Sequence, residues 1–503
     1  MPVSTFPKPV PALQPNTFAF ETTPLVKPTG FREYDARWRF PEEINLLGMQ
    51  ALGLGMAHLM EARGKSKRIV VGHDFRGYSC SIKLAMVTGL LAGGVEVHDI
   101  GLALSPMAYF AQFDLDVEAV AMVTASHNDN GWTGVKMGFE RPMTFGPDDM
   151  GQLRDLVLGG GLEMPGGGRY IRVENFRERY IADLTDREKI KRPLKVVAAC
   201  GNGTAGAFAE DILTRIGCEV VPLDCELDHT FPRYNPNPED MAMLHALRDA
   251  VLEHNADVGL AFDGDGDRCG VVDNEGEEIF ADKVGVMLAR DISAQFKDAR
   301  FVVDVKSTGL FATDPVLEAH GAKTDYWKTG HSYIKRYNHE HGTLVGFEKS
   351  GHFFFSPPIG RGYDDGFVAA LAVCDMLDRS PEKSMADLRK ALPMTYQSPT
   401  MSPHCADEEK YEVIAGIVAH FEAIAARGEE LAGQPIRELI TVNGIRIVLE
   451  DGTWGLVRAS SNKPELVVVV ESPTSEANKL AIFNALDAHL STLPQVGEYN
   501  QKL

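Results

Sequence analysis

The feature that most constrains the fold is a pattern that the chain repeats three times. An apolar strand is followed by a polar loop, a stretch with helical periodicity, a glycine and a second apolar strand. The first strands are 68–71, 194–199 and 301–305, and the glycines before the second strands are Gly94, Gly217 and Gly321. This order of elements is a βαβ unit. The copies lie roughly 106–126 residues apart, so we predict three related α/β domains rather than a short-period solenoid.

The end of the chain has a different pattern of predicted strands and helices. After about residue 395, we predict antiparallel strands over 440–449, 455–458 and 466–471, with a turn at 451–452 and a closing helix over 476–490. This fourth domain is therefore α+β. The glycine-rich segment 159–168 marks the end of the first α/β domain. The proline-rich stretch 1–27 lacks a signal-peptide pattern, and we predict an extended arm that is either disordered or packed on the first domain.

Composition narrows the class of protein and of partner. The 503 residues are 44% hydrophobic and 24% charged, as in ordinary soluble proteins of three or four domains. A net charge of −21 argues against nucleic acid or acidic membranes as partners. No apolar run reaches the roughly 18 residues of a membrane span. The seven cysteines are scattered without a Cys-x-x-Cys pair, which predicts reduced thiols in a cytoplasmic protein.

Three aspartates alternate with glycines at Asp263, Asp265 and Asp267, and Arg268 follows directly. An EF-hand loop also spaces aspartates in this way, but it needs glycine where Arg268 stands and glutamate where Asn274 stands. A solvated acidic turn remains an alternative. We favour a hairpin between 258–262 and 269–273 that presents the carboxylates to one ion. Hard oxygen ligands without nearby His or Cys favour Mg²⁺ over zinc.

Arg268 beside so much negative charge indicates an anionic substrate, because guanidinium binds such groups through two hydrogen bonds.

Ser126 follows the buried strand 119–123, and open α/β sheets bind ligands at such strand ends. The hydrolase motif Gly-x-Ser-x-Gly is absent, which argues against acyl transfer. Ser126 is either a turn residue or a carrier of a phosphoryl group beside the metal. Lys136 is either a surface charge or a proton donor or acceptor.

Two further loops have candidate binding chemistry. The loop 346–352 combines Glu348, Ser350 and His352 after an apolar strand, which suits recognition of vicinal sugar hydroxyls or is an ordinary polar loop. The segment 458–464 is dense in hydrogen-bond donors between two strands. It suits a phosphate dianion, and its alternative is a hairpin turn with an incidental arginine.

These four loops, one in each predicted domain, resemble those of the α-D-phosphohexomutase family. The likeness runs from about Gly30 to about Leu490, and the Ser-Gly-His ending of 350–352 is most similar to the bacterial phosphomannomutase/phosphoglucomutase subgroup. The resemblance implies four domains around a central cleft. Their predicted bounds are an arm over 1–29, a phosphoserine domain over 30–168, a metal-binding domain over 169–278, a sugar-binding domain over 279–394 and a phosphate-binding domain over 395–503.

The resemblance also implies an activity and the residues that carry it. The enzyme would interconvert hexose 1-phosphate and hexose 6-phosphate through phosphorylated Ser126, one Mg²⁺ per chain and a bisphosphorylated hexose as intermediate and activator. It would act as a monomer or weak dimer. The implied catalytic residues are Ser126, Lys136, Arg37 and His352. The implied metal ligands are phospho-Ser126, Asp263, Asp265 and Asp267. The implied substrate-binding residues are Tyr34, Arg268, Lys306, His331, Glu348, Ser350, Gly351, Arg458, Ser460, Ser461 and Asn462.

The sequence departs from the subgroup in the sugar loop. Phe347 stands where the subgroup has Gly, Lys349 replaces Met or Gln, and the extension 356–361 is unfamiliar. These departures bear on the choice among mannose, glucose and glucosamine. The alternatives are a phosphoglucosamine mutase on the same scaffold, a magnesium-dependent sugar phosphatase, and an inactive sugar-phosphate-binding protein. A phosphatase needs no second phosphate clamp far from Ser126, which argues against it.

Overall fold

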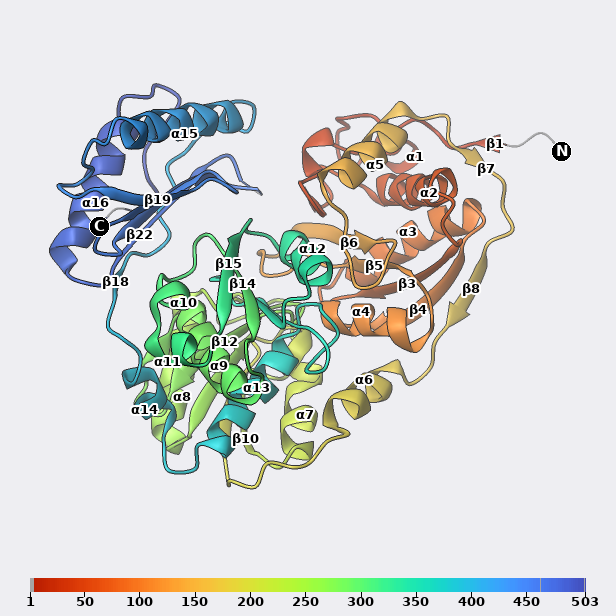
Figure 1. Ribbon diagram of the computed structural model, residues 1–503. Helices are drawn as coiled ribbons and strands as arrows, with labels where there is room; N and C mark the ends of the chain where they lie inside the picture. The colour runs from red at the N-terminus through yellow and green to blue at the C-terminus, as the bar shows by residue number, and fades with distance from the viewer. Residues whose placement is uncertain (1–3, 462, 502) are drawn as a thin grey trace. The chain divides into compact units, whose positions relative to one another are not determined.

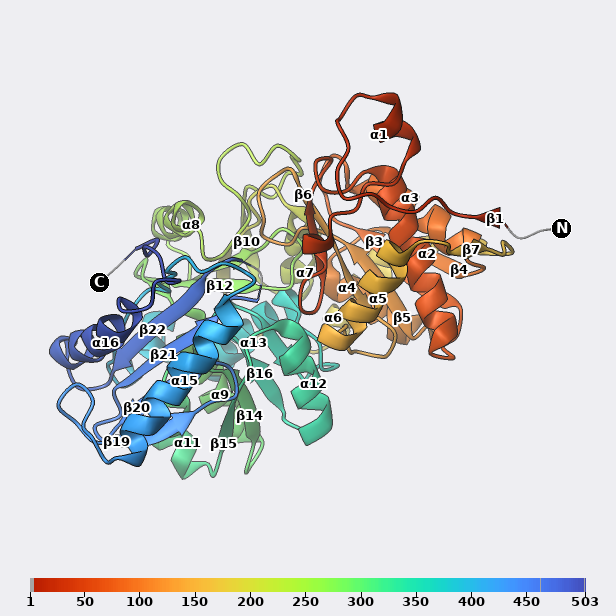
Figure 2. The same ribbon diagram turned by 90° about the horizontal axis from the view of Figure 1, so that it is seen from above.

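The computed structural model describes residues 4–461, 463–501 and 503 (Figures 1 and 2). The chain forms two compact units, each built from two segments of sequence. The first unit contains Met1–Ala281 and Ser350–Ala386, and the second contains Asp282–Lys349 and Asp387–Leu503. In the described part of the chain, none of the helices combines the length and the apolarity that crossing a bilayer requires.

A mixed sheet of six strands begins the first unit, in the order β2-β6-β5-β3-β4-β8. The strands β5, β3, β4 and β8 run parallel, and β6 and β2 are antiparallel to their neighbours. The strands are β2 (Ala36–Arg39), β3 (Arg68–His73), β4 (Glu96–Leu102), β5 (Ala119–Val123), β6 (Trp132–Gly138) and β8 (Arg169–Arg172). The strand β8 follows the glycine-rich segment.

Helices cover both faces of this sheet. Figure 1 shows α2 (Leu46–Ala62), α3 (Ser79–Ala92) and α5 (Pro147–Gly159) on one face and α4 (Ser105–Asp114) on the other. Glycines allow α2 and α3 to approach closely. A Cβ at Gly53 would lie 2.1 Å from the Met86 carbonyl oxygen, and one at Gly89 would lie 2.0 Å from that of Gln50. Larger side chains at these positions would push the helices apart.

The N-terminal arm packs on this first sheet domain, which is the second of the two alternatives predicted for it. The short strand β1 (Ser4–Thr5) pairs with β7 (Glu163–Met164), and Phe6 is buried. The arm also contains α1 (Phe18–Thr22) and the 3₁₀ turn η1 (Pro28–Gly30). The buried Asn45 ties it down, because its side chain accepts from the Leu25 amide at 2.9 Å and donates to the Phe20 carbonyl at 2.8 Å.

The second sheet of the first unit has the order β10-β9-β11-β12-β13. The strands β10, β9 and β11 are parallel, and β11 and β12 form the predicted antiparallel hairpin. The elements of this part of the unit are α6 (Phe176–Thr185), β9 (Lys195–Ala199), η2 (Thr204–Ala207), α7 (Ala209–Arg215), β10 (Glu219–Leu223), α8 (Met241–His254), β11 (Val258–Phe262), β12 (Cys269–Asp273), β13 (Glu278–Ile279) and α13 (Gly366–Arg379). The strand β17 (Phe353–Phe355) also belongs to the residues of this unit but is not a strand of this sheet.

The second unit begins with parallel strands in the order β15-β14-β16. Its elements in this part of the chain are α9 (Ala281–Gln295), β14 (Arg300–Asp304), α10 (Leu310–Thr313), α11 (Pro315–Ala319), β15 (Lys323–Trp327), α12 (His331–His341), β16 (Val345–Phe347) and α14 (Met385–Lys390). The pairs β3–β4, β9–β10 and β14–β15 are all parallel with helix between them. The three predicted βαβ units are therefore confirmed.

The rest of the second unit is an antiparallel sheet in the order β18-β22-β21-β20-β19, as the predicted α+β class requires. Its elements are β18 (Tyr396–Gln397), α15 (Lys410–Ala426), β19 (Ile436–Ile440), β20 (Ile445–Leu449), β21 (Trp454–Ala459), β22 (Leu466–Ser472) and α16 (Glu476–Leu490). The prediction of one strand over 440–449 was wrong. A turn at Asn443-Gly444, with Gly444 at φ 71°, separates β19 from β20.

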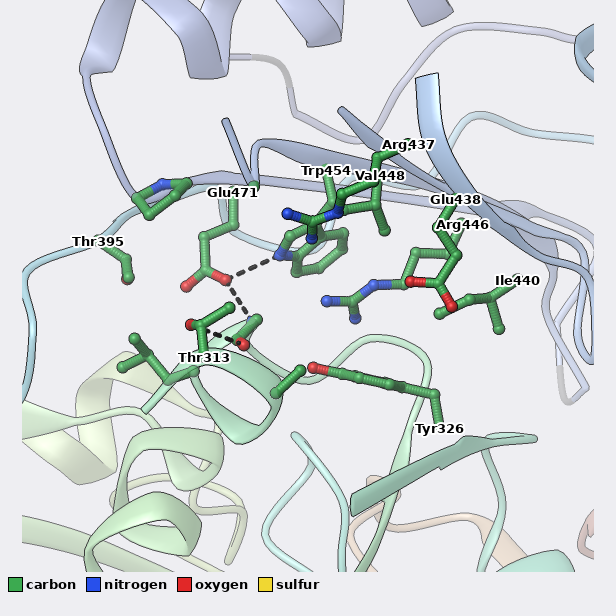
Figure 3. A pocket seen from close by; sticks show the side chains of 15 residues that line it. Thr313, Tyr326, Thr395, Arg437, Glu438, Ile440, Arg446, Val448, Trp454 and Glu471 are labelled. Carbon is green, nitrogen blue, oxygen red and sulfur yellow. Dashed lines mark hydrogen bonds between the residues drawn. The ribbon is translucent and has the colours of Figure 1, made fainter. Parts of the chain in front are cut away.

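A buried polar junction joins the two sheets of the second unit (Figure 3). The Glu471 carboxylate accepts hydrogen bonds from Lys283 Nζ at 2.7 Å, the Gly309 amide at 2.7 Å and Trp454 Nε1 at 2.8 Å. Figure 3 shows the Arg446 guanidinium between two rings, with its carbon 3.7 Å from the Trp454 centroid and 4.2 Å from that of Tyr326. The adjoining pocket of about 40 Å³ has room for only a few water molecules.

Candidate active site

Ser126 lies at the carboxyl end of the first sheet, in the loop that follows β5. Its φ of 53° is left-handed, which is uncommon for a residue other than glycine and marks a loop held by its surroundings. The Thr124 hydroxyl accepts from the Ser126 amide at 2.8 Å, and the buried Arg76 donates to the Ser126 carbonyl at 2.8 Å. These bonds aim the Ser126 hydroxyl toward the second sheet of the same unit.

Asp74 and Arg76 were missed by the sequence analysis. Asp74 is fully buried directly after β3, where its carboxylate accepts from the Thr124 hydroxyl at 2.9 Å and pairs with Arg76. The signal for Asp74 was available, because the ends of parallel neighbouring strands meet at one edge of the sheet. A buried carboxylate that follows β3 therefore had to lie beside the loop that follows β5.

The three aspartates are fully buried in the loop between β11 and β12. Asp263 Oδ2 lies 3.2 Å from the Ser126 hydroxyl oxygen, although the residues are 137 positions apart in sequence. A Cβ at Gly264 would lie 2.6 Å from the Ser126 carbonyl oxygen, so only glycine permits this approach of the two loops. Ser126 and the Asp triplet therefore lie side by side within the first unit, as predicted.

The triplet fits a hard divalent cation. Ligand oxygens of Asp263, Asp265 and Asp267 lie within 4.8 Å of one another. The Oδ1 atoms of Asp265 and Asp267 are buried and accept no hydrogen bond from any described residue. Buried acceptors without donors are costly, and a cation would satisfy them. Burial, with Asp267 and Asp265 beside it, raises the pKa of the Asp263 carboxyl well above its usual value.

Lys136 on β6 is fully inserted between two of these carboxylates. Its Nζ lies 2.7 Å from Asp265 Oδ2 and also pairs with Asp267 Oδ2. Burial acts to lower the pKa of Lys136, but Asp265 and Asp267 outweigh burial and hold that pKa well above its usual value. The Ser105 hydroxyl, 2.5 Å from Asp265 Oδ2, is another partner that the sequence analysis missed. In this arrangement, Lys136 is protonated and acts as a donor.

Arg37 on β2 also contacts the serine loop. It donates to the Thr124 carbonyl at 2.7 Å and pairs with Asp35 at 2.8 Å. Burial raises the pKa of the Asp35 carboxyl, and Arg37 opposes that rise. Tyr34 is buried in the segment that precedes β2. Arg37 is thus next to the loop that carries Ser126.

A further cluster in the first unit centres on the predicted substrate-binding residue Arg268. Its Nε donates to His352 Nε2 at 2.9 Å, and its Nη1 lies 3.1 Å from a Glu239 carboxylate oxygen. Since Nε2 of His352 is an acceptor here, the imidazole proton is on Nδ1, which lies 2.9 Å from Asp364 Oδ2. Asp364 was not predicted. Its carboxylate lies at ion-pair distance from the imidazole ring.

The backbone brings His352 to the Asp triplet. Gly351, at φ 93°, accepts from the Cys269 amide at 3.0 Å, directly beyond Arg268. His352 Nδ1 lies 3.6 Å from Asp267 Oδ1. Ser350 precedes this contact and is half-buried. The Ser-Gly-His segment and the hairpin loop between β11 and β12 therefore form one side of the site.

In the second unit, Glu348, Lys306 and His331 gather around the end of β14. Glu348 Oε1 accepts from the Gly330 amide at 2.6 Å, directly before His331 begins α12. Lys306 Nζ lies 3.8 Å from Asp304 Oδ2. Glu348 and His331 are buried. The predicted sugar-binding residues of this unit are thus neighbours in one part of its fold.

The predicted phosphate loop is at the end of β21, also in the second unit. Arg458 is buried and donates to the Ala459 carbonyl at 2.7 Å. The Ser460 amide donates to the Glu465 carbonyl at 2.9 Å, and its hydroxyl accepts from the Lys463 amide at 3.3 Å. Ser461 is half-buried, and Asn462 lies outside the described residues. The buried Arg458 guanidinium lies at the base of this loop.

Comparisons with known proteins cover nearly the whole chain. Four family models match in succession, described as phosphoglucomutase/phosphomannomutase alpha/beta/alpha domain I (residues 28–160), domain II (178–276), domain III (280–396) and C-terminal domain (404–488). The phosphomannomutase/phosphoglucomutase of Pseudomonas putida is 33% identical, over 88% of this chain and 91% of that protein. The phosphoglucomutase of Neisseria meningitidis serogroup A is 31% identical, over 89% and 94%. A family protein of known structure from Burkholderia thailandensis is 27% identical, with a TM-score of 0.81 over 93% and 98%.

Proposed function

Because the chain belongs to the phosphoglucomutase/phosphomannomutase family, we propose that it interconverts hexose 1-phosphate and hexose 6-phosphate, with mannose or glucose as the sugar. One observation carries the mechanism. The Ser126 hydroxyl, in a left-handed loop, lies 3.2 Å from a fully buried triplet of aspartates that is suited to a divalent metal. A hydroxyl held in this way can carry a phosphoryl group between two positions of a sugar.

The metal would be held by Asp263, Asp265, Asp267 and the phosphate on Ser126, and all-oxygen ligands favour Mg²⁺. When bound, Mg²⁺ supplies neutralisation of charge on the transferring phosphoryl group. Phosphorylated Ser126 gives its phosphoryl group to the free hydroxyl of the sugar phosphate. The bisphosphorylated sugar then turns within the site, and Ser126 takes the phosphoryl group from the other position.

Arg268 and His352 account for the proton that leaves the sugar hydroxyl. In the structure, Arg268 Nε–H occupies the Nε2 lone pair of His352. If Arg268 turns to bind the substrate's phosphate, Nε2 becomes free to accept the hydroxyl proton. Asp364, 2.9 Å from Nδ1, then stabilises the imidazolium. Binding of the anion would thus activate the base, and Lys136 would remain a cation between Asp265 and Asp267.

The second unit would supply the rest of substrate recognition. Glu348 and the nearby Lys306 and His331 suit the sugar hydroxyls, because carboxylate, amine and imidazole groups provide both acceptors and donors. The turn at Arg458 suits the phosphate that is not being transferred. A bisphosphorylated hexose that escapes during the reaction would rephosphorylate Ser126 and so act as an activator.

The test is a phosphorus NMR time course with glucose, mannose and glucosamine 1-phosphates offered separately to the wild type and to Ser126→Ala. We expect 6-phosphate from the wild type, and a fall of several orders of magnitude in kcat for Ser126→Ala, because the covalent route is lost. Intact mass should show a phosphate on part of the wild type and none on the variant. Ser81→Ala, at an exposed serine of α3, is the matched control.

Each outcome has a clear meaning. Full turnover by Ser126→Ala would end the phosphoserine mechanism. Release of inorganic phosphate without isomerisation would make the protein a phosphatase. Turnover confined to glucosamine 1-phosphate would assign the alternative mutase on the same scaffold.

A further inference from the structure

Two cysteines that the proposed mechanism does not use lie in contact in the second sheet of the first unit. The sulfur atoms of Cys200 and Cys225 are 3.5 Å apart. All seven cysteines of the chain are free thiols in the structure. Two thiols this close can form a disulfide bond if the backbone holds their side chains toward each other.

The backbone holds both. Cys200 directly follows β9 and Cys225 follows β10, and these strands are parallel neighbours with Ala199 opposite Leu223. The Cys200 amide continues the pairing by donating to the Leu223 carbonyl at 3.1 Å. Asp224 is left-handed at φ 50°, which interrupts the alternation of side chains along β10. Cys225 is thereby turned to the same side as Cys200.

The two thiols are not equivalent. Cys200 is fully buried, whereas Cys225 is half-buried and reaches solvent. The contact with Cys225 and burial raise the pKa of the Cys200 thiol well above its usual value. An accessible thiol beside a buried one of raised pKa is the arrangement of an attacking and a resolving cysteine.

We propose that Cys200 and Cys225 are a redox-active pair that a hydroperoxide converts into an intramolecular disulfide. The Cys225 sulfur attacks the hydroperoxide oxygen, the O–O bond breaks, and Cys225 becomes a sulfenic acid while an alcohol, or water from H₂O₂, leaves. The Cys200 sulfur then attacks the Cys225 sulfur, the S–O bond breaks, and the hydroxyl leaves as water with the Cys200 proton. Two thiols lose two electrons and the peroxide gains them.

This bond would disturb the segment that supports the Asp triplet. The sulfurs must approach from 3.5 Å to about 2.05 Å, so the backbone near Cys225 has to move. A Cβ at Gly206 would lie 2.1 Å from the Cys225 carbonyl oxygen, so η2 rests directly on that backbone. Thr204 of η2 donates through its amide to the Gly264 carbonyl at 3.3 Å and accepts from the Phe75 amide at 2.9 Å. Oxidation therefore loosens η2 and its contact with the metal loop.

The test treats the reduced full-length protein with H₂O₂ and maps its disulfides. Cleavage after Lys, Arg and Glu separates Cys218 from Cys225 at Glu219, so the linked peptides identify the pair without ambiguity. We expect more than half of the molecules to lose two hydrogen atoms in a Cys200–Cys225 linkage that dithiothreitol reverses. In Cys200→Ser, the reaction should stop at a dimedone-reactive Cys225. In Cys225→Ser, neither product should form at this site.

Hydrogen exchange of the segment 201–208 tests the structural consequence. We expect at least tenfold faster exchange in the oxidised wild type and no change in peroxide-treated Cys225→Ser. The exposed Cys80 is an internal control for exposure to peroxide. If Cys80 is oxidised while Cys200 and Cys225 remain thiols in the wild type, the pair is not redox-active and the proposal is overturned. If the disulfide forms and exchange of 201–208 is unchanged, the link to the metal loop is overturned.

Discussion

Replacing the buried Glu471 by glutamine should strongly destabilise the second unit. Neighbouring Lys283 and hydrogen bonds from Gly309 and Thr395, working against burial, lower the pKa of this carboxyl from 4.5 to about 2. At about 1.4 kcal/mol for each tenfold change, that difference corresponds to about 3 kcal/mol of unfolding free energy at pH 7. Glutamine keeps the shape and the acceptor for the Gly309 amide, but it leaves the Lys283 ammonium without its counter-charge.

The pH dependence follows from the sign of this change. A carboxyl whose pKa is lowered on folding contributes its full stabilisation above pH 4.5 and loses it as the pH falls toward about 2. The gap between wild type and Glu471→Gln should therefore be constant from pH 7 to pH 5. At pH 3 it should have fallen to about half of its value at neutral pH.

Hydrogen exchange of the β21 and β22 amides, read by mass spectrometry, measures this gap within the second unit. A loss of about 3 kcal/mol corresponds to roughly hundredfold faster exchange. Glu438→Gln is the matched control, because Glu438 lines the same pocket and is exposed. If Glu471→Gln exchanges like Glu438→Gln at pH 7, or if the gap does not narrow at pH 3, the charge pair is not what holds this junction.

Three further predictions concern the proposed reaction. Arg458→Ala should weaken binding of both the 1-phosphate and the 6-phosphate by about ten- to hundredfold, because a bidentate contact of roughly 1.5–3 kcal/mol is lost, and should release more bisphosphorylated sugar. Kinetics with each substrate would check this, and an effect on one substrate alone would contradict a shared clamp. Chelation of the metal should abolish turnover while circular dichroism stays unchanged, and Ca²⁺ should not restore the rate. Ser105→Ala should weaken Mg²⁺ binding by about tenfold in calorimetry, since Asp265 loses a charge-assisted hydrogen bond; unchanged affinity would count against that role.

The regular elements of the fold were predictable because each carries its own local signal. The strands β3, β9 and β14 are apolar runs that end in polar loops, and α16 spans the predicted residues 476–490 directly after the capping Ser475. The failure over 440–449 has a local cause as well. Asn443-Gly444 is a turn signal inside an apolar stretch, and the apolar pattern on both sides masked it. The packing of the N-terminal arm depended on Asn45, whose partners lie 20 to 25 residues away and carry no pattern.

The site was predictable where a short motif supplies the chemistry, as at Ser126 and at the Asp triplet. It was not predictable where single residues act through tertiary contacts. Arg76 reaches the serine loop across 50 positions, and Ser105 reaches Asp265 across 160. Asp364, twelve positions after His352 in the same segment of the first unit, lies 2.9 Å from its Nδ1. None of these three has a sequence environment that distinguishes it from other surface or capping residues.

Lys136 and a metal ion would use different oxygen atoms of the Asp triplet. Lys136 contacts the Oδ2 atoms of Asp265 and Asp267, and the Oδ1 atoms of both remain without a hydrogen bond from the described residues. A cation held by these aspartates would therefore leave the contacts of Lys136 in place. Two negative charges beside a phosphorylated serine would repel it, and Lys136 reduces that repulsion from the far side. A lysine fixed in this way is poorly placed to exchange protons with a sugar. His352 is the better candidate for the proton acceptor, because its Nε2 can accept a proton once Arg268 donates to the substrate instead.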